Sequence, residues 1–152
     1  MSKLPDSICI RGLATGDYEK WLALWKLYQV FYETSIPEEV SQESFRRMLD
    51  PSEPAAGALA FDGEMAVGMV NWIFHRSNWT IGDYCYLQDL YVSEKIRGAG
   101  VGRMLIEHVC AEARQKKCCC VYWLTHETNA KARRLYDRIA KHQGFIKYRK
   151  EI

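Results

Sequence analysis

The chain has 152 residues, of which 48% are hydrophobic and 26% are charged, and its formal net charge is +2. These values are typical of one globular domain over residues 1–152; the charge is too small to indicate a nucleic-acid partner, and no apolar run reaches the roughly 18 residues that a membrane span needs. The first ten residues contain no apolar signal core, so we expect a cytoplasmic protein that does not bind membranes.

The first predicted elements are a strand and an aromatic helix. Residues 7–13 are expected to form the strand, and residues 15–34 the helix, with Thr15 as its N-cap. The aromatic side chains that lie close to one stripe of this helix are Tyr18, Trp21, Trp25, Tyr28 and Tyr32. Such a stripe either packs into a core or lines a pocket or partner surface, and the sequence leaves both interpretations open.

A second helix and a hairpin follow. The helix is predicted to begin near Ser41 and is stopped by Pro51. The strongest hairpin signal of the chain is Asp62-Gly63, which divides residues 57–75 into two antiparallel strands.

The second half of the chain is expected to alternate strands and helices. Strands are predicted over residues 84–92, 118–126 and 145–152, with a helix over 129–143. The clearest amphipathic helix starts near Gly102. The expected order is β-α-α-β-β-β-α-β-α-β, which is an α/β fold with helices packed on a mixed sheet.

Six cysteines are present, three of them consecutive at 118–120, and none forms a C-x-x-C pair. Adjacent residues of a strand point to opposite faces and do not converge on one ion, so no metal site is expected. We interpret the cysteines as small buried apolar residues of a reducing compartment.

Three alternating glycines, Gly98, Gly100 and Gly102, stand at the start of the amphipathic helix. Each costs about 1 kcal/mol relative to alanine in a helix, so the backbone must need them. Amides at a helix N-terminus bind anions, and glycine lets a phosphate approach without meeting a Cβ, so a diphosphate is the expected ligand. A P-loop is excluded because no Gly-Lys-Ser/Thr follows, and a dinucleotide fold because Ser93–Arg97 separate the strand from the glycines.

The sequence RGAGVG of residues 97–102 matches the R/Q-x-x-G-x-G/A signature of the GNAT N-acetyltransferase superfamily. The strand LQDLYV before it, the segment TNAKARRLY after the next strand and the closing Gly144-Phe145 stand where that superfamily has them. The resemblance spans residues 7–150 and is nearest to the small-amine, polyamine and histone-acetyltransferase-like branch. It implies the GNAT acyl-CoA N-acyltransferase fold, with acetyl-CoA as the cosubstrate and no metal.

The resemblance also implies which residues would hold acetyl-CoA. The backbone of Leu90, Tyr91 and Val92 would hydrogen-bond the acetyl group and the pantetheine arm. Asn129 would contact the pantetheine end, with Ala132 leaving room beside it. The phosphates would lie against Arg97, Gly98, Ala99, Gly100, Val101, Gly102 and Arg103.

Acetyl transfer to an amine needs two proton transfers, one from the amine and one to the departing thiolate. Tyr136 matches the superfamily tyrosine that serves as the acid, although a core tyrosine would give the same helical pattern. Gln88 stands where polyamine acetyltransferases carry a glutamate, so we expect it beside the substrate and not as the base. Asp89 is then the candidate base, with Asp83, Glu33 or a water chain as alternatives.

Charge is unevenly distributed along the chain. Residues 1–82 hold 7 Lys/Arg against 11 Asp/Glu, whereas residues 83–152 hold 14 against 8. Either the two halves expose different solvated faces, or the basic half binds an anionic ligand and the acidic half attracts a cationic one. The acidic side chains near the expected amine entrance are Glu33, Glu38, Glu39 and Glu43, with Glu33 placed at the substrate.

We therefore expect an acetyl-CoA-dependent N-acetyltransferase in which a primary amine attacks directly. Its substrate would be a small cationic molecule or a lysine-like side chain, and a homodimer is a candidate assembly. The alternative is a catalytically silent CoA-binding or protein-interaction module.

Overall fold

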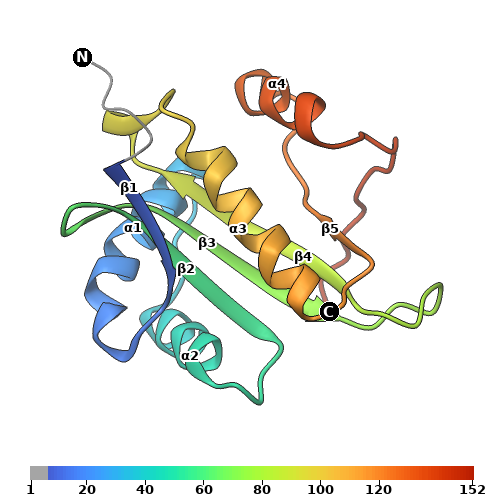
Figure 1. The fold of residues 1–152 in the computed structure, drawn as a ribbon, viewed down its shortest axis with the longest axis horizontal. Coiled ribbons are helices and arrows are strands. Elements are labelled where there is room, and N and C mark those ends of the chain that lie inside the picture. Colours follow the sequence, from blue (N-terminus) through green and yellow to red (C-terminus); the bar gives the residue numbers. More distant parts are fainter. Residues whose placement is uncertain (1–6) are drawn as a thin grey trace.

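A five-stranded mixed sheet forms the centre of the fold in the computed structural model, which describes residues 7–152 (Figure 1). The strands lie side by side in chain order, and each neighbouring pair is antiparallel except the last pair, which is parallel. They are β1 Ile8–Gly12, β2 Ala55–Asp62, β3 Met65–His75, β4 Tyr84–Val92 and β5 Cys120–Tyr122.

Helices cover both faces of this sheet (Figure 1). Helices α1 Tyr18–Phe31 and α2 Glu38–Leu49 pack on one face, and α3 Val101–Gln115 packs on the other. Helix α4 Ala130–Ile139 lies beyond β5 and has no fully buried residue. Two short 3-10 turns, Thr15–Asp17 and Glu94–Ile96, precede α1 and α3.

The starts of α1 and α2 differ from the sequence prediction. The N-cap of α1 is Asp17, not Thr15, because residues 15–17 form a 3-10 turn before the helix. The Asp17 carboxylate closes this turn by accepting a 2.7 Å hydrogen bond from the Ala14 amide, and it also accepts a 2.6 Å hydrogen bond from Arg11. Helix α2 begins at Glu38, ahead of Ser41, which is buried and accepts a 3.0 Å hydrogen bond from the Trp25 indole.

The aromatic stripe of α1 divides between core and cavity. Trp21 and Trp25 are buried and stacked with ring centroids 5.3 Å apart, and Trp21 has no exposed surface. Tyr28 and Tyr32, one and two turns further, line a cavity beside β4. Both interpretations left open by the sequence therefore hold, each for one end of the helix.

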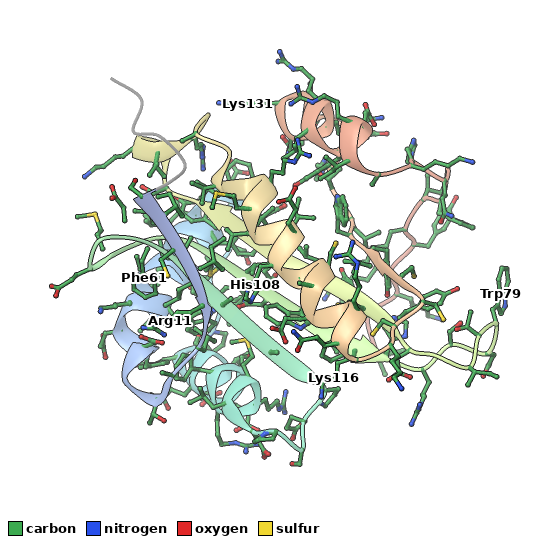
Figure 2. All side chains as sticks on the ribbon, viewed as in Figure 1. Arg11, Phe61, Trp79, His108, Lys116 and Lys131 are labelled. Carbon is green, nitrogen blue, oxygen red and sulfur yellow. The ribbon has the colours of Figure 1, made fainter. Side chains whose placement is uncertain are left out.

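The hairpin between β2 and β3 turns at Asp62-Gly63 as predicted, with Gly63 at a φ of 63°. The next connection, from β3 to β4, projects from the opposite end of the sheet from the glycine loop. Its Trp79 is 88% exposed and stands far from α4, on which Lys131 is labelled (Figure 2).

The predicted last strand, residues 145–152, is wrong: among the described residues the chain forms no strand after α4. The predicted strand over 118–126 shrinks to β5, and the order becomes β-α-α-β-β-β-α-β-α. A strand needs the backbone of a neighbour to pair with, and the apolar alternation of Ile146, Tyr148 and Ile152 supplies no such partner by itself. These three side chains are instead exposed to solvent.

The cysteines are less buried than predicted. Cys85 is buried in the core, whereas Cys9, Cys119 and Cys120 are exposed, since Cys119 and Cys120 lie where the sheet ends at β5. All six thiols are free, and within residues 7–152 no group of three or more His, Cys, Asp or Glu side chains is placed to hold a metal ion. Over the same residues no helix is long and apolar enough to cross a membrane.

Candidate active site

A β-bulge in β4 sets which face of the sheet the β4 side chains beside the site occupy. Asn71 of β3 pairs with Asp89, and Trp72 pairs with Leu87, so Gln88 is the extra residue of β4. Side chains alternate strictly along a regular strand, and one extra residue shifts the alternation. Leu87 therefore packs on the α3 face, while Asp89 turns to the α1 face.

The parallel pair β4 and β5 opens next to this bulge. Pairing runs only from Tyr84 with Cys120 to Tyr86 with Tyr122, although β4 continues to Val92. In the described structure the backbone of β4 beyond Tyr86 thus has no β5 neighbour. Such an exposed strand edge offers free N–H and C=O groups to a ligand.

A small cavity of about 30 Å³ occupies this opening. Its wall carries a few polar groups among aromatic and aliphatic side chains, as is usual for ligand sites. The lining residues are Tyr28, Tyr32, Leu87, Gln88, Leu90, Ile106, Trp123, Leu124, Thr125 and Tyr136. The opening therefore brings Gln88, Leu90 and Tyr136, all predicted from the sequence, around one space.

The glycine loop lies at the end of β4 and leads into α3. Gly98 and Gly100 have φ values of 88° and 82°, a region that side chains other than glycine rarely adopt, and Gly100 is the N-cap of α3. A Cβ at either position would meet no protein atom within 4 Å, so the space in front of both glycines is open. The first amides of α3 have no partner within the helix, and the positive end of the helix dipole favours an anion there.

The two arginines of the loop have different surroundings. Arg97 donates a 3.0 Å hydrogen bond from Nε to the Val92 carbonyl, and its guanidinium lies 5.5 Å from the centroid of the Tyr91 ring. It therefore ties the loop to the end of β4 on the α1 face. Arg103 is exposed on α3 and donates a 2.9 Å hydrogen bond to Glu107.

Of the three residues predicted from this segment, only Tyr136 of α4 lines the cavity, while Asn129 is the N-cap of α4 and Ala132 lies in its first turn. The Asn129 side chain accepts a 3.4 Å hydrogen bond from the Ala132 amide, and so caps the helix, and it lies 3.4 Å from the hydroxyl of Thr125. Tyr136 packs edge-on against Trp123 with ring centroids 5.4 Å apart. Burial raises the pKa of Tyr136, and a negative charge on Tyr32 would raise it further.

Asp89 is only 9% exposed and belongs to a polar chain under α1. The Trp21 indole donates to Asn71 Oδ1 at 3.1 Å, and Asn71 Nδ2 donates to Asp89 Oδ2 at 3.2 Å. Burial raises the pKa of Asp89 to about 6, although the hydrogen bond from Asn71 and the nearby Tyr28 side chain favour its ionised form.

The structure separates the candidate bases of the sequence analysis. Asp83 lies just before β4, at the end remote from the glycine loop, where it forms a 3.1 Å ion pair with Arg76. It does not line the described cavity, so the structure does not support that alternative. Glu33 is exposed in the turn after α1 at a φ of 53° and does not line the described cavity.

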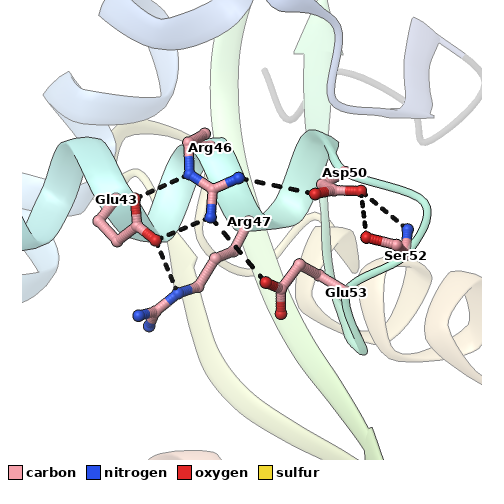
Figure 3. Close-up of polar contacts among 6 residues, drawn as sticks. All are labelled: Glu43, Arg46, Arg47, Asp50, Ser52 and Glu53. Atoms are coloured by element: carbon pink, nitrogen blue, oxygen red, sulfur yellow. Dashed lines mark hydrogen bonds and ion pairs between the residues drawn. The ribbon is translucent and has the colours of Figure 1, made fainter.

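Of the four acidic side chains predicted near the amine entrance, Glu43 is neutralised by arginines of its own helix, α2. Glu43 accepts a 2.8 Å hydrogen bond from Arg46 and a 3.1 Å one from Arg47, and these hold its pKa at about 2 (Figure 3). Arg46 also lies 3.6 Å from Asp50. Glu38 and Glu39, in the first turn of α2, remain exposed and follow the cavity residue Tyr32 closely along the chain.

Several cavity residues were not singled out by the sequence. Trp123, Leu124 and Thr125 were expected to continue a strand, and they enter the site because β5 ends at Tyr122. The sequence indicates Tyr28 only as one member of an aromatic stripe. Helical spacing reveals which residues share a face, but not which of them pass beyond the edge of the core.

The protein is of the α/β class, with an open strand edge and a helix N-terminus suited to an anion at the same end of its mixed sheet. The family model described as "Acetyltransferase (GNAT) family" matches residues 21–142, and the chain belongs to this family of N-acetyltransferases. The fold class expected from the sequence is thereby confirmed.

Relatives and solved structures agree with the family. The chain is 38% identical over 147 residues to the D-amino-acid N-acetyltransferase HPA3 of Saccharomyces cerevisiae, which covers 95% of this chain and 91% of that protein. It is 28% identical over 142 residues to the thialysine N-epsilon-acetyltransferase of Sus scrofa, covering 88% and 83% of the two chains. The solved structure of AAC(6')-Iy in complex with a CoA-containing bisubstrate analogue has a TM-score of 0.82 at 19% identity, and the match covers 95% of this chain and 99% of that chain.

Proposed function

We propose that this protein is an acetyl-CoA-dependent N-acetyltransferase that acetylates a primary amine by direct attack. The observation that carries the proposal is the opening between β4 and β5, which has the glycine loop at one end and Tyr136 in its wall. The membership in an N-acetyltransferase family supports the same reaction.

The glycine loop is the proposed binding site for the diphosphate of CoA. Open space before Gly98 and Gly100 lets two phosphates approach the amides at the start of α3, and a side chain at either glycine would fill that space. The residues proposed to line the diphosphate are Arg97, Gly98, Ala99, Gly100, Val101, Gly102 and Arg103. Arg97 acts mainly by holding the loop on β4, because its Nε is bonded to the Val92 carbonyl.

The open edge of β4 is the proposed site for the thioester end. Backbone groups of Leu90, Tyr91 and Val92 that β3 and Arg97 do not use are proposed to hydrogen-bond the pantetheine arm, and one amide to polarise the acetyl carbonyl as an oxyanion hole would. Asn129 and Ala132 are proposed to contact the pantetheine end from the start of α4, where the Ala132 amide already orients the Asn129 side chain.

Tyr136 and Asp89 are the proposed proton donor and acceptor. Tyr136 hydrogen-bonds the departing thiolate; since burial raises its pKa above that of a thiol, it stabilises the thiolate as a donor and need not give up its proton completely. Asp89, with its pKa of about 6, is ionised at neutral pH and accepts the proton of the amine. Gln88 is proposed to hydrogen-bond the acceptor molecule from the cavity wall.

The proposed acceptor is the amino group of a small cationic molecule or a lysine-like side chain. Relatives named as D-amino-acid and thialysine N-acetyltransferases support small amines of amino-acid type. Glu33, Glu38 and Glu39, exposed near the cavity end of α1, support attraction of a positive charge.

A homodimer is the proposed assembly. The segment after α4 exposes Phe145, Ile146 and Tyr148 by 81%, 75% and 87%, and a groove of about 510 Å³ lies between α3, β5 and the end of α4. Exposed apolar side chains and an open sheet edge on one molecule favour exchange between two copies. We further propose that the chain forms one domain. A cytoplasmic location is proposed as well, because all six thiols are free.

Release of free CoA thiol over a panel of amines tests this function. The panel contains D- and L-amino acids, thialysine, lysine peptides and polyamines, and mass spectrometry identifies the acetylated nitrogen. Turnover on at least one amine is expected. Tight binding of CoA in a calorimeter without turnover on any amine would instead favour a silent CoA-binding module.

A further inference from the structure

Two tyrosines form the last pair of the ladder between β4 and β5. Tyr86 pairs in register with Tyr122, and beyond this pair the two strands separate. The residues that follow on the two strands, Leu87 on β4 and Trp123 on β5, both line the cavity. The tyrosine pair therefore lies at the closed end of the opening, directly beside the space where the amine is proposed to react.

Both tyrosine rings lie on the α1 face of the sheet. Their chain neighbours Cys85 and Val121 pack in the core cluster that α3 covers, so alternation along the strands turns Tyr86 and Tyr122 to the opposite face. Neither tyrosine belongs to a core cluster of the described residues, and both are only half-buried. Helix α1 lines the cavity from this same face through Tyr32, so the two rings extend the cavity wall.

The rings of Tyr86 and Tyr122 form a corner. Their centroids are 5.0 Å apart, and their planes meet at 76°. A third ring that lies parallel to one of them is close to perpendicular to the other, so it can stack on the first and meet the second edge to face. Both arrangements are favourable for aromatic pairs. The corner is therefore shaped to hold one more flat ring.

His75 of β3 holds Tyr122 in this position. Its Nε2 lies 2.7 Å from the Tyr122 hydroxyl, and its Nδ1 lies 2.8 Å from the Arg76 carbonyl oxygen. A carbonyl can only accept, so Nδ1 carries the hydrogen, and Nε2 of the neutral imidazole accepts the proton of Tyr122. The imidazole also packs edge-on against the Tyr122 ring, with centroids 5.7 Å apart. Tyr122 is thus oriented before a ligand arrives, which lowers the entropic cost of binding.

We propose that the corner between Tyr86 and Tyr122 binds an aromatic ring carried by the acceptor amine. This inference rests on the proposed function, and it names the part of the acceptor that lies outside the cavity. The cavity of about 30 Å³ has room for about two water-sized groups, which is enough for the reacting amino group. The rest of a small amine must then lie on the surface beside the cavity, where the corner stands.

A second positive charge on the acceptor fits the corner less well than a ring does. Both carboxylates that flank Tyr86 along the chain are already engaged. Asp83 forms a 3.1 Å ion pair with Arg76, and Asp89 is buried and accepts a hydrogen bond from Asn71. The ring geometry and the paired charges together favour an aryl group as the occupant.

Three primary amines that differ beyond the amino group test this inference: phenethylamine, cyclohexylethylamine and a linear diamine of similar length. A cyclohexyl group buries at least as much apolar surface as a phenyl group, so apolar burial alone would favour the cyclohexyl amine. The corner should reverse this order and give phenethylamine a kcat/KM about 5-fold above that of the cyclohexyl amine. The difference should lie mainly in KM, because the ring is remote from the reacting atoms.

Variants of the two tyrosines connect this preference to the corner. Tyr86→Leu and Tyr122→Leu each remove one side of the corner and should lower the phenyl-to-cyclohexyl ratio of kcat/KM to about 1. Tyr86→Phe keeps the ring and should keep the wild-type ratio. Trp79→Leu is the matched control, since it removes a ring that is 88% exposed in the connection between β3 and β4 (Figure 2). Both amines are compared in one preparation, so a partly unfolded variant does not alter the ratio.

The outcomes separate this inference from the proposed function. A wild-type ratio in either leucine variant, or a wild type that prefers the cyclohexyl amine or the diamine, would overturn the aryl site alone. A wild type that acetylates other amines but not phenethylamine would do the same. A wild type that acetylates no amine at all would overturn the proposed function itself.

Discussion

The side-chain amide of Asn71 donates a 3.2 Å hydrogen bond to the carboxylate of Asp89, between the two residues that face each other across β3 and β4. This pair stands directly beside the bulge at Gln88. The bulge turns Asp89 towards α1, and Asn71 keeps it there. An ionisable group is therefore retained in a nearly dry position, where its ionised form costs free energy that one hydrogen bond from Asn71 offsets only in part.

Replacing Asp89 with an uncharged residue should raise the free energy of unfolding, because the cost of burying the charge is removed. The folded-state pKa of about 6 lies above the ordinary value of 3.8, so folding favours the protonated acid. The stabilisation associated with the protonated form is complete below about pH 4 and is lost as pH rises through 6. Asp89→Asn should thus stabilise the protein by about 3 kcal/mol at pH 7.5 and by little at pH 4, as urea unfolding at both pH values can measure. Equal effects at the two pH values would contradict a raised pKa.

Gly100→Glu should abolish acetyl-CoA binding while the fold survives. The change puts a side chain and a negative charge into the space before the helix N-terminus, and its strain at a φ of 82° is limited to about 1 to 2 kcal/mol. Gly63→Glu is the matched control, since its φ is 63° and a Cβ there also meets nothing within 4 Å. Calorimetry should show a Kd raised at least 100-fold for Gly100→Glu and unchanged for Gly63→Glu. Equal affinities of the two variants for acetyl-CoA would mean that the glycine loop only begins α3 and does not bind the diphosphate.

Tyr136→Phe should lower kcat by about 10²-fold with little change in the Kd for acetyl-CoA. The ring and its edge contact with Trp123 remain, so the melting temperature should stay within a few degrees of wild type. Tyr84→Phe, at the end of β4 remote from the glycine loop, serves as the control and should keep full activity. A loss of stability with unchanged kcat per folded molecule would mean that Tyr136 only packs in the core and does not act as the proton donor.

Charge reversal at Glu38 and Glu39 should raise KM for a cationic amine more than it lowers kcat. Long-range attraction by these exposed carboxylates is screened within about 10 Å at 0.1 M salt, so kcat/KM should also fall as ionic strength rises. Glu43 is excluded from the test because Arg46 and Arg47 already neutralise it. Reversal at Glu64 and Glu112 adds the same charge elsewhere and should leave KM unchanged. A neutral or anionic preferred acceptor would contradict this prediction.

Removing residues 144–152 should convert the proposed dimer to a monomer. The removed segment contains the exposed Phe145, Ile146 and Tyr148 but contributes no strand to the described sheet, so the truncated chain should still fold. Sedimentation equilibrium at matched concentrations compares the two chains. A full-length monomer, or a dimer that persists after truncation, would show that this segment packs on its own molecule or plays no part in assembly.

The sequence was most informative where one residue type forces one backbone conformation. Asp62-Gly63 located the hairpin, and the positive φ values of Gly98 and Gly100 match the need inferred from their spacing. The bulge at Gln88 was not visible, because a bulge depends on how two strands pair and leaves no local pattern. The last strand was wrongly predicted for the same reason: alternation indicates a face but not a neighbour. The position of Tyr28 in the cavity wall could not be predicted either, because it depends on where the end of α1 passes beyond the core.

The bulge at Gln88 also bears on how new specificities can evolve. A bulged residue has no register partner, and the Gln88 side chain points into the cavity rather than into either packed layer. Substitutions at this position therefore change the surface offered to the acceptor molecule without disturbing the core. Position 88 can accept amide, acid or apolar side chains with little loss of folding stability. Its neighbours Leu87 and Asp89 are buried on opposite faces of the sheet, so substitutions there would disturb the packing.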